Sequence, residues 1–203
     1  MNMMRFGLVT ICETLGKHLH AAPSYPVNVI MTMSFLAAAA AMAVFAFVMV
    51  QAALTDLLTR KIRNRLVLMC LAAYAVLAPL AGFTAREIAG SVIVALAVLL
   101  VALLLFAWGF IGGGDAKLAA VTSLWFGIDQ TPNYFIWTAL LGGAFAVAII
   151  LFRKLPLPGG IQTGNWIAKL HSRGTGMPYG VAMALAALLV FPATRWATVF
   201  FGV

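Results

Sequence analysis

Long apolar runs alternate with short polar or glycine-rich segments along most of the chain. The runs are continuous rather than alternating from residue to residue. This favours helices over the strands of a barrel, and most runs can cross a hydrocarbon core of about 30 Å. We predict spans at residues 35–54, 66–80, 88–110, 134–152 and 179–201, with a kink at Pro192 in the last. The chain is therefore expected to be an all-α integral membrane protein, a bundle of about six transmembrane helices.

The remaining apolar segment, residues 115–126, is too short to cross a membrane by itself. A helix of that length rises about 18 Å, so we expect it to reach only partway or to begin inside the protein, where it lines a cavity. Residues 127–133 are rich in glycine, proline, asparagine and aspartate. That composition predicts a turn-rich loop between the short segment and the next span.

Residues 1–34 differ from the rest of the chain. They mix charged residues with prolines, and they show neither the strongly basic start nor the small-residue cleavage site of a secretory signal. Met31 and Met33 stand just before the first strong span. We interpret residues 1–34 as an N-terminal extension that is poorly ordered or precedes the true start. Residues 35–203 are expected to form the six-helix membrane domain.

The charges indicate how the chain is oriented. Only 9% of the residues are charged, against about a quarter in ordinary globular domains, and the net charge is +8. The Lys and Arg residues cluster between apolar runs, which argues for orientation in a lipid bilayer and against nucleic acid as a partner. Nine of the 13 fall in segments that we assign to the cytoplasmic face, and this assignment puts the N-terminus outside. The nine are Arg60, Lys61, Arg63, Arg65, Lys117, Arg153, Lys154, Lys169 and Arg173.

Cysteine and histidine give no sign of a metal or cofactor site. Cys12 and Cys70 are far apart and form no CxxC pair, so neither a zinc ribbon nor a thiol redox motif is predicted. Cys70 lies in an apolar run and is expected to pack as a small apolar residue. His18 and His20 are two positions apart, which does not place them on one helix face, and His171 is distant.

Two acids, Asp56 and Asp115, fall where a span meets the cytoplasmic face. A carboxylate in so apolar a chain is a candidate functional group. If the helices bring the two together, they could share a proton and hold a water that attacks a carbonyl, which is aspartic-protease chemistry without a metal. A structural alternative is that Asp115 only caps a helix after glycines 112–114 and that Asp56 only pairs with Arg60. A functional alternative is a proton relay or a small transporter subunit.

Three motifs resemble those of the type IV prepilin peptidases, which are GxGD aspartic peptidases of the membrane. They are Gly112-Gly113-Gly114-Asp115 continuing to Lys117, Asp56 followed by Ile62-Arg63-Asn64, and Pro178-Tyr179-Gly180-Val181-Ala182. The resemblance covers roughly residues 35–200 and implies that Asp56 and Asp115 are the catalytic acids. It assigns supporting motif positions to Gly112, Gly114, Lys117, Asn64, Pro178, Tyr179 and Gly180.

The resemblance also implies a substrate and a location. Family members cleave the leader from prepilin or pseudopilin subunits at the bacterial inner membrane, with the acids facing the cytoplasm, and the pilus assembly machinery is a further expected partner. Arg63 stands where the family has proline, so the turn after the first acid loses its fixed φ. The chain lacks the family's large insertion with paired CxxC motifs. It is therefore similar to the short branch of tight-adherence (Flp-type) pili, in which methylation is not implied. A non-catalytic pilus assembly protein with the same fold is the remaining alternative.

Overall fold

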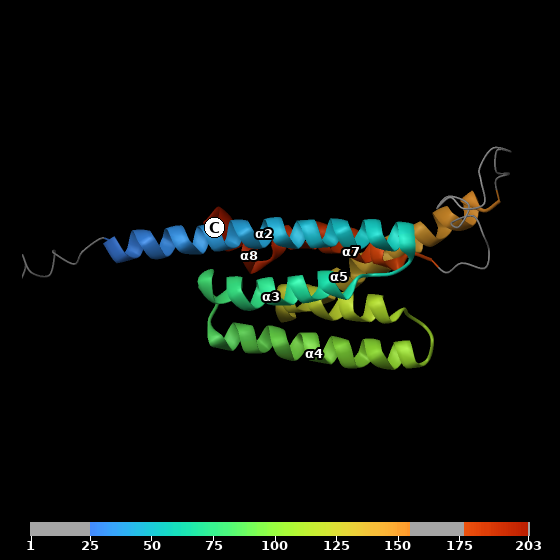
Figure 1. The fold of residues 1–203 in the computed structure, drawn as a ribbon, viewed down its shortest axis with the longest axis horizontal. Coiled ribbons are helices and arrows are strands. Elements are labelled where there is room, and N and C mark those ends of the chain that lie inside the picture. Colours follow the sequence, from blue (N-terminus) through green and yellow to red (C-terminus); the bar gives the residue numbers. More distant parts are fainter. Residues whose placement is uncertain (1–24, 155–176, 203) are drawn as a thin grey trace, which may run out of the picture. The chain divides into compact units, whose positions relative to one another are not determined.

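The computed structural model describes residues 25–154 and 177–202, and no strand occurs in either range. The helices are α2 (Tyr25–Thr59), α3 (Asn64–Leu80), α4 (Ala85–Ala107), α5 (Gly113–Phe152), α7 (Tyr179–Val190) and α8 (Arg195–Phe201), with a short 3₁₀ turn, η1 (Phe191–Ala193), between the last two (Figure 1). Contacts divide the chain into residues 1–33 and 34–203, and the packing described below belongs to the second unit. The prediction of an all-α membrane protein is confirmed.

Three helices in the described part of the chain are long and apolar enough to cross a membrane, and α7 with α8 makes a fourth if the pair counts as one span. That pair is bent by 48° around η1, which contains Pro192, so the predicted kink is confirmed. The first span is longer than predicted, because α2 begins at Tyr25 and its candidate span covers Met31–Thr59 instead of residues 35–54. Single polar residues lower the hydropathy of residues 25–34 without breaking a helix.

The long helix α5 folds back on itself at Gly127, whose φ of 61° and ψ of −162° are not helical. The rings of Phe126 and Tyr134 lie 5.3 Å apart, whereas eight residues of straight helix would separate them by about 12 Å. Figure 1 shows the two halves running in opposite directions. Glycine is suited to this position because it has no Cβ to oppose a positive φ.

The predicted loop at residues 127–133 is therefore wrong, because helix resumes directly after Gly127. The polar residues that suggested a loop instead form the first turn of the second half. Asp129 is favourable there because it faces the positive end of the helix dipole. The Thr131 hydroxyl donates to the Gly127 carbonyl at 2.5 Å, which secures the turn.

Successive segments reverse direction, so the connections fall at two ends of the bundle (Figure 1). We call one the aspartate end, where α2 leads into α3 and α4 leads into α5. The distal end carries the α3–α4 turn, Gly127 and η1. The first half of α5, residues 113–126, lies in the middle of the bundle, since almost every residue from Ala116 to Phe126 is buried. This short segment therefore lies inside the protein along most of its length, although its first residues, 113–115, are only half-buried.

Aromatic side chains fill the core toward the distal end. The Trp125 ring lies 5.2 Å from Phe45 and 4.9 Å from Trp196. The Trp125 indole donates to the Cys70 carbonyl at 3.2 Å, and the Trp196 indole donates to the Trp125 carbonyl at 3.2 Å. Both indole N–H groups are thus paired, and the cluster joins α2, α3, α5 and α8 around the central segment. Cys70 is buried there, as its apolar context predicts.

An ion pair between Arg195 and Glu87 closes the distal end. The Arg195 guanidinium also donates to the Gly82 carbonyl at 3.2 Å and lies 4.8 Å from the centre of the Phe83 ring. Glu87 makes a second interaction: its carboxylate accepts a hydrogen bond of 2.8 Å from the Thr84 amide, as part of the capping box at the start of α4. These contacts connect α8 with the α3–α4 turn.

Glu87→Ala is expected to destabilise the protein more than Glu87→Gln. Both lose the ion pair with Arg195, worth about 0.5 kcal/mol because both side chains are well exposed. Only the alanine variant also loses the capping interaction with Thr84, worth about 1 kcal/mol. Thermal unfolding in detergent would measure the difference, and equal losses in the two variants would show that the cap contributes nothing.

Candidate active site

Asp56 lies in the last turn of α2 and is buried, with 6% of its surface exposed. The helix ends at Thr59. The next residue, Arg60, has a left-handed φ of 57°, and its amide donates to the Asp56 carbonyl at 2.9 Å. The Asp56 carboxylate accepts a hydrogen bond of 2.8 Å at Oδ2 from the backbone amide of Gly180. The guanidinium of Arg60 is near enough to interact electrostatically with Asp56. Asp56 therefore interacts with the charge of Arg60 as well as with the Gly180 amide.

Asp115 lies at the start of α5 and is half-buried. The helix begins at Gly113 and its N-cap is Gly112, so Asp115 is the third helical residue and not the cap. The side chain instead turns back toward the backbone of Gly112. A Cβ at Gly112 would come within 3.1 Å of Asp115 Oδ2, which explains the small residue at this position. Asp115 also lies near enough to Asp56 for the two carboxylates to repel one another.

Two contacts connect the motif that follows Asp56 with the motif around Asp115. Ile62 packs on Gly114, where a Cβ would lie 3.2 Å from the Ile62 Cβ and 3.5 Å from the Ile62 amide nitrogen. One turn farther along α5, the Lys117 ammonium group donates to the side-chain oxygen of Asn64 at 3.0 Å. Residues 53 positions apart are therefore joined at the aspartate end. Lys117 is held by Asn64, a contact that its sequence context did not predict.

The third motif opens α7 and contacts Asp56. Pro178 is buried before the helix, and Gly180 contacts Asp56. Tyr179 packs on the second half of α5, where a Cβ at Gly142 would lie 3.0 Å from its ring. Gly142 therefore allows the close approach of Tyr179, whereas a Cβ at Gly143 would meet nothing within 4 Å.

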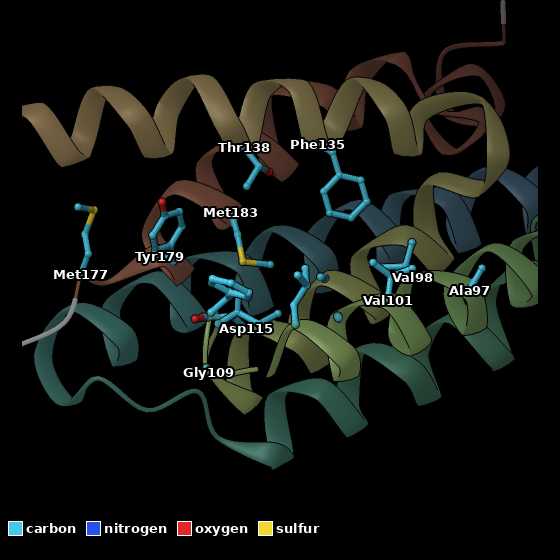
Figure 2. Close-up of a pocket in the computed structure, with 16 residues that line it drawn as sticks. Ala97, Val98, Val101, Gly109, Asp115, Phe135, Thr138, Met177, Tyr179 and Met183 are labelled. Carbon is cyan, nitrogen blue, oxygen red and sulfur yellow. The ribbon is translucent and has the colours of Figure 1, made fainter. Parts of the chain in front are cut away.

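A cleft of about 850 Å³ opens beside Asp115 (Figure 2). Its walls come from α4, the α4–α5 connection, both halves of α5 and the start of α7. Tyr179 is the one other motif residue besides Gly112 and Asp115 that lines it. Sequence reasoning missed the remaining walls, which are Ala97, Val98, Val101, Ala102, Leu105, Gly109, Phe110, Ile111, Ala119, Phe135, Thr138, Met177 and Met183. Most are apolar helix residues of the same types that face lipid, so the sequence does not distinguish cleft-lining positions from lipid-facing ones.

Comparison with known families decides the class of protein. A family model described as the type IV leader peptidase family matches residues 43–147, more than half of the chain. The chain belongs to this family. No curated protein and no solved structure matches it. The matched region contains Asp56, Asn64 and the glycine-rich motif of Asp115, whereas the Pro178–Gly180 motif lies beyond its end. The structure nevertheless joins that motif to Asp56.

Gly114→Ala is expected to lower the activity of this peptidase about tenfold. Its Cβ would lie 3.2 Å from the Ile62 Cβ, an atom that can move only with the backbone, so relieving the contact would displace the two aspartate motifs from one another. Gly113→Ala is the matched control, since its Cβ would meet only the Phe106 ring at 3.3 Å, and a side chain can rotate away. Peptide cleavage by membranes that hold equal amounts of each variant would test this. Equal activity of the two variants would contradict a role for the Ile62 contact.

Proposed function

We propose that this peptidase removes the leader from type IV prepilins of the Flp type, with Asp56 and Asp115 as its two catalytic acids. The observation that carries the proposal is the convergence of the two carboxylates at one end of the bundle. They come from helices whose motifs are tied together by Ile62 on Gly114 and by Gly180 on Asp56. Hydrolysis by such a pair needs no nucleophilic side chain and no cofactor.

The proposed reaction uses one water molecule. The ionised carboxylate takes a proton from the water, and the water oxygen bonds to the carbonyl carbon of the scissile peptide. The protonated carboxyl donates to the carbonyl oxygen, which gives a tetrahedral diol. The diol then collapses: one of its hydroxyls returns a proton to the carboxylate that had protonated the carbonyl oxygen, the C–N bond breaks, and the leaving nitrogen receives a proton from the carboxyl that took one from the water. The leader leaves with a new carboxylate and the pilin with a new amine.

The basic residues support the proposed orientation. Lys61, Arg63 and Arg65 are exposed at the aspartate end, and Arg60 lies near enough to Arg153 for their charges to interact. Positive charge at this end favours the cytoplasmic side of a bacterial inner membrane, where it can contact lipid phosphates. The acids then face the cytoplasm and the N-terminus lies outside. A leader that has not crossed the membrane would meet the acids from that side.

The absence of the family proline does not argue against activity. Arg63 is the N-cap of α3 and adopts a φ of −72°, which lies within the range that proline would impose. The turn after Asp56 therefore keeps the geometry that proline favours. Arginine at this position leaves the unfolded chain with more conformational entropy than proline would, which lowers the stability of the fold slightly. It does not change the shape of the active site.

Leader cleavage in a defined membrane tests the proposal. The purified protein in liposomes would be mixed with a small single-span pilin whose basic leader ends in glycine before the apolar run. Mass spectrometry is expected to find one cut, after that glycine. An intact leader, together with proton flux through the liposomes that depends on the two aspartates, would contradict the proposal and favour a proton pathway.

A further inference from the structure

The cleft beside Asp115 is elongated along α4. Its α4 wall includes Ala97, Val101 and Leu105, which are spaced four residues apart and therefore lie on one face of the helix. From Ala97 to Leu105 the wall rises about 12 Å. Phe135 and Met183 belong to walls from the second half of α5 and from α7 (Figure 2). The space is thus an apolar channel alongside α4, with room for another helix segment.

The single carboxylate that lines the cleft lies toward the aspartate end, near the point where α4 stops. Asp115 is the only acidic residue among the described residues that line it. A lipid tail in the cleft would offer this carboxylate no hydrogen bond. The first turn of a helix offers several free backbone N–H groups and the positive end of the helix dipole. The charge at this position therefore suits a helix that starts at Asp115 and continues along α4.

We propose that this cleft binds the first two turns of the substrate's apolar helix, which starts just after the scissile bond. A helix about 10 Å wide that rises 1.5 Å per residue occupies roughly 120 Å³ per residue. The cleft volume of about 850 Å³ then holds about seven residues. The inference rests on the proposed function and deepens it: the enzyme recognises the apolar segment of the pilin as well as the leader, and Val101 is a residue that determines specificity.

Val101→Trp is expected to raise the KM for the pilin at least tenfold with a smaller change in kcat, because the indole would occupy part of the cleft. Leu100→Trp is the matched control. Leu100 is the preceding residue on α4, it is 62% exposed against 57% for Val101, and it does not line the cleft. Its variant should stay within twofold of the wild type. Equal KM values for the two tryptophan variants would overturn the proposal.

Photo-crosslinking gives a readout that does not need turnover. A diazirine-bearing amino acid of about the size of leucine, small enough to leave the cleft open, would replace Val101 or Leu100 in the Asp56→Asn background. The variants would be placed in liposomes with a synthetic peptide that has a lysine-containing leader, a glycine and a twenty-residue apolar segment. An adduct at position 101 that maps to the first two turns of the apolar segment, without one at position 100, is the expected result. Equal adducts at both positions, no peptide adduct at 101, or a lipid adduct only would overturn the proposal.

The two proposals can fail separately. Cleavage of the peptide by the wild-type protein decides the proposed function, and the mapped adduct at position 101 decides the occupant of the cleft. Cleavage without that adduct would leave a leader peptidase that binds the apolar segment elsewhere. An adduct without cleavage would support the cleft as a binding site for an apolar helix and contradict the catalytic proposal.

Discussion

Asp56→Asn and Asp115→Asn are each expected to reduce leader cleavage at least about a thousandfold. Asparagine keeps the size of the side chain but can neither accept the proton of the attacking water nor return it. Both carboxylates are needed in the proposed reaction, so the double variant should be no worse than either single one. Cleavage of the pilin by membranes that contain equal amounts of each variant measures this.

Asp129→Asn is the control for the loss of an acid from this chain. Asp129 is exposed in the first turn of the second half of α5, at the distal end. Its replacement should leave cleavage unchanged. Full activity of either Asp56→Asn or Asp115→Asn would exclude the mechanism with two aspartates, whereas loss of activity together with loss of the folded protein would show a structural role for the acid.

Gly180→Ala is expected to lower kcat about a hundredfold. The added Cβ would lie 2.8 Å from Asp56 Oδ2 and 3.1 Å from Asp56 Cβ, closer than side chains tolerate. Either Asp56 rotates away or the start of α7 moves, and both changes lengthen the hydrogen bond from the Gly180 amide. A displacement of about 1 Å at a catalytic group can cost a hundredfold in rate.

Gly143→Ala provides the comparison, because a Cβ at this helical glycine meets nothing within 4 Å. It should leave cleavage unchanged and slightly raise the thermal stability, since alanine favours helix over glycine by about 1 kcal/mol. If Gly180 only positions Asp56, kcat should fall in Gly180→Ala while the KM for the pilin and the melting temperature change little. A large rise in KM with an unchanged kcat would contradict that role.

The sequence predicted the fold class and the main helices because long apolar runs have one common solution in a bilayer. The end of α5 at Phe152 and the start of α7 at Tyr179 agree with the predicted spans. The prediction of a loop at residues 127–133 was wrong because the same polar residue types favour both loop turns and the first turn of a helix. Composition alone does not separate these outcomes when a single glycine supplies the whole turn.

The sequence indicated two candidate acids at a common depth but not the contacts around them. The spacing of Asp56 and Asp115 from their span ends indicated a common depth, and the structure places both at one end of the bundle. The contact of Gly180 with Asp56 joins residues 124 positions apart, and no local pattern specifies such a pairing. The walls of the cleft were hidden for a different reason. In a membrane protein, apolar residue types such as the valine at position 101 occur both on surfaces that face lipid and in the walls of a binding site.

The single-residue turn at Gly127 limits how the length of this chain can vary. A flexible loop would accommodate an inserted residue without moving its neighbours. After Gly127 the helix is continuous, so an inserted residue there shifts every residue that follows in the helix. Each insertion would rotate all later residues of α5 by about 100° and move Phe135 and Thr138 out of the cleft wall. Proteins that share this architecture should therefore keep the 23-residue interval from Asp115 to Thr138 even where little sequence identity remains.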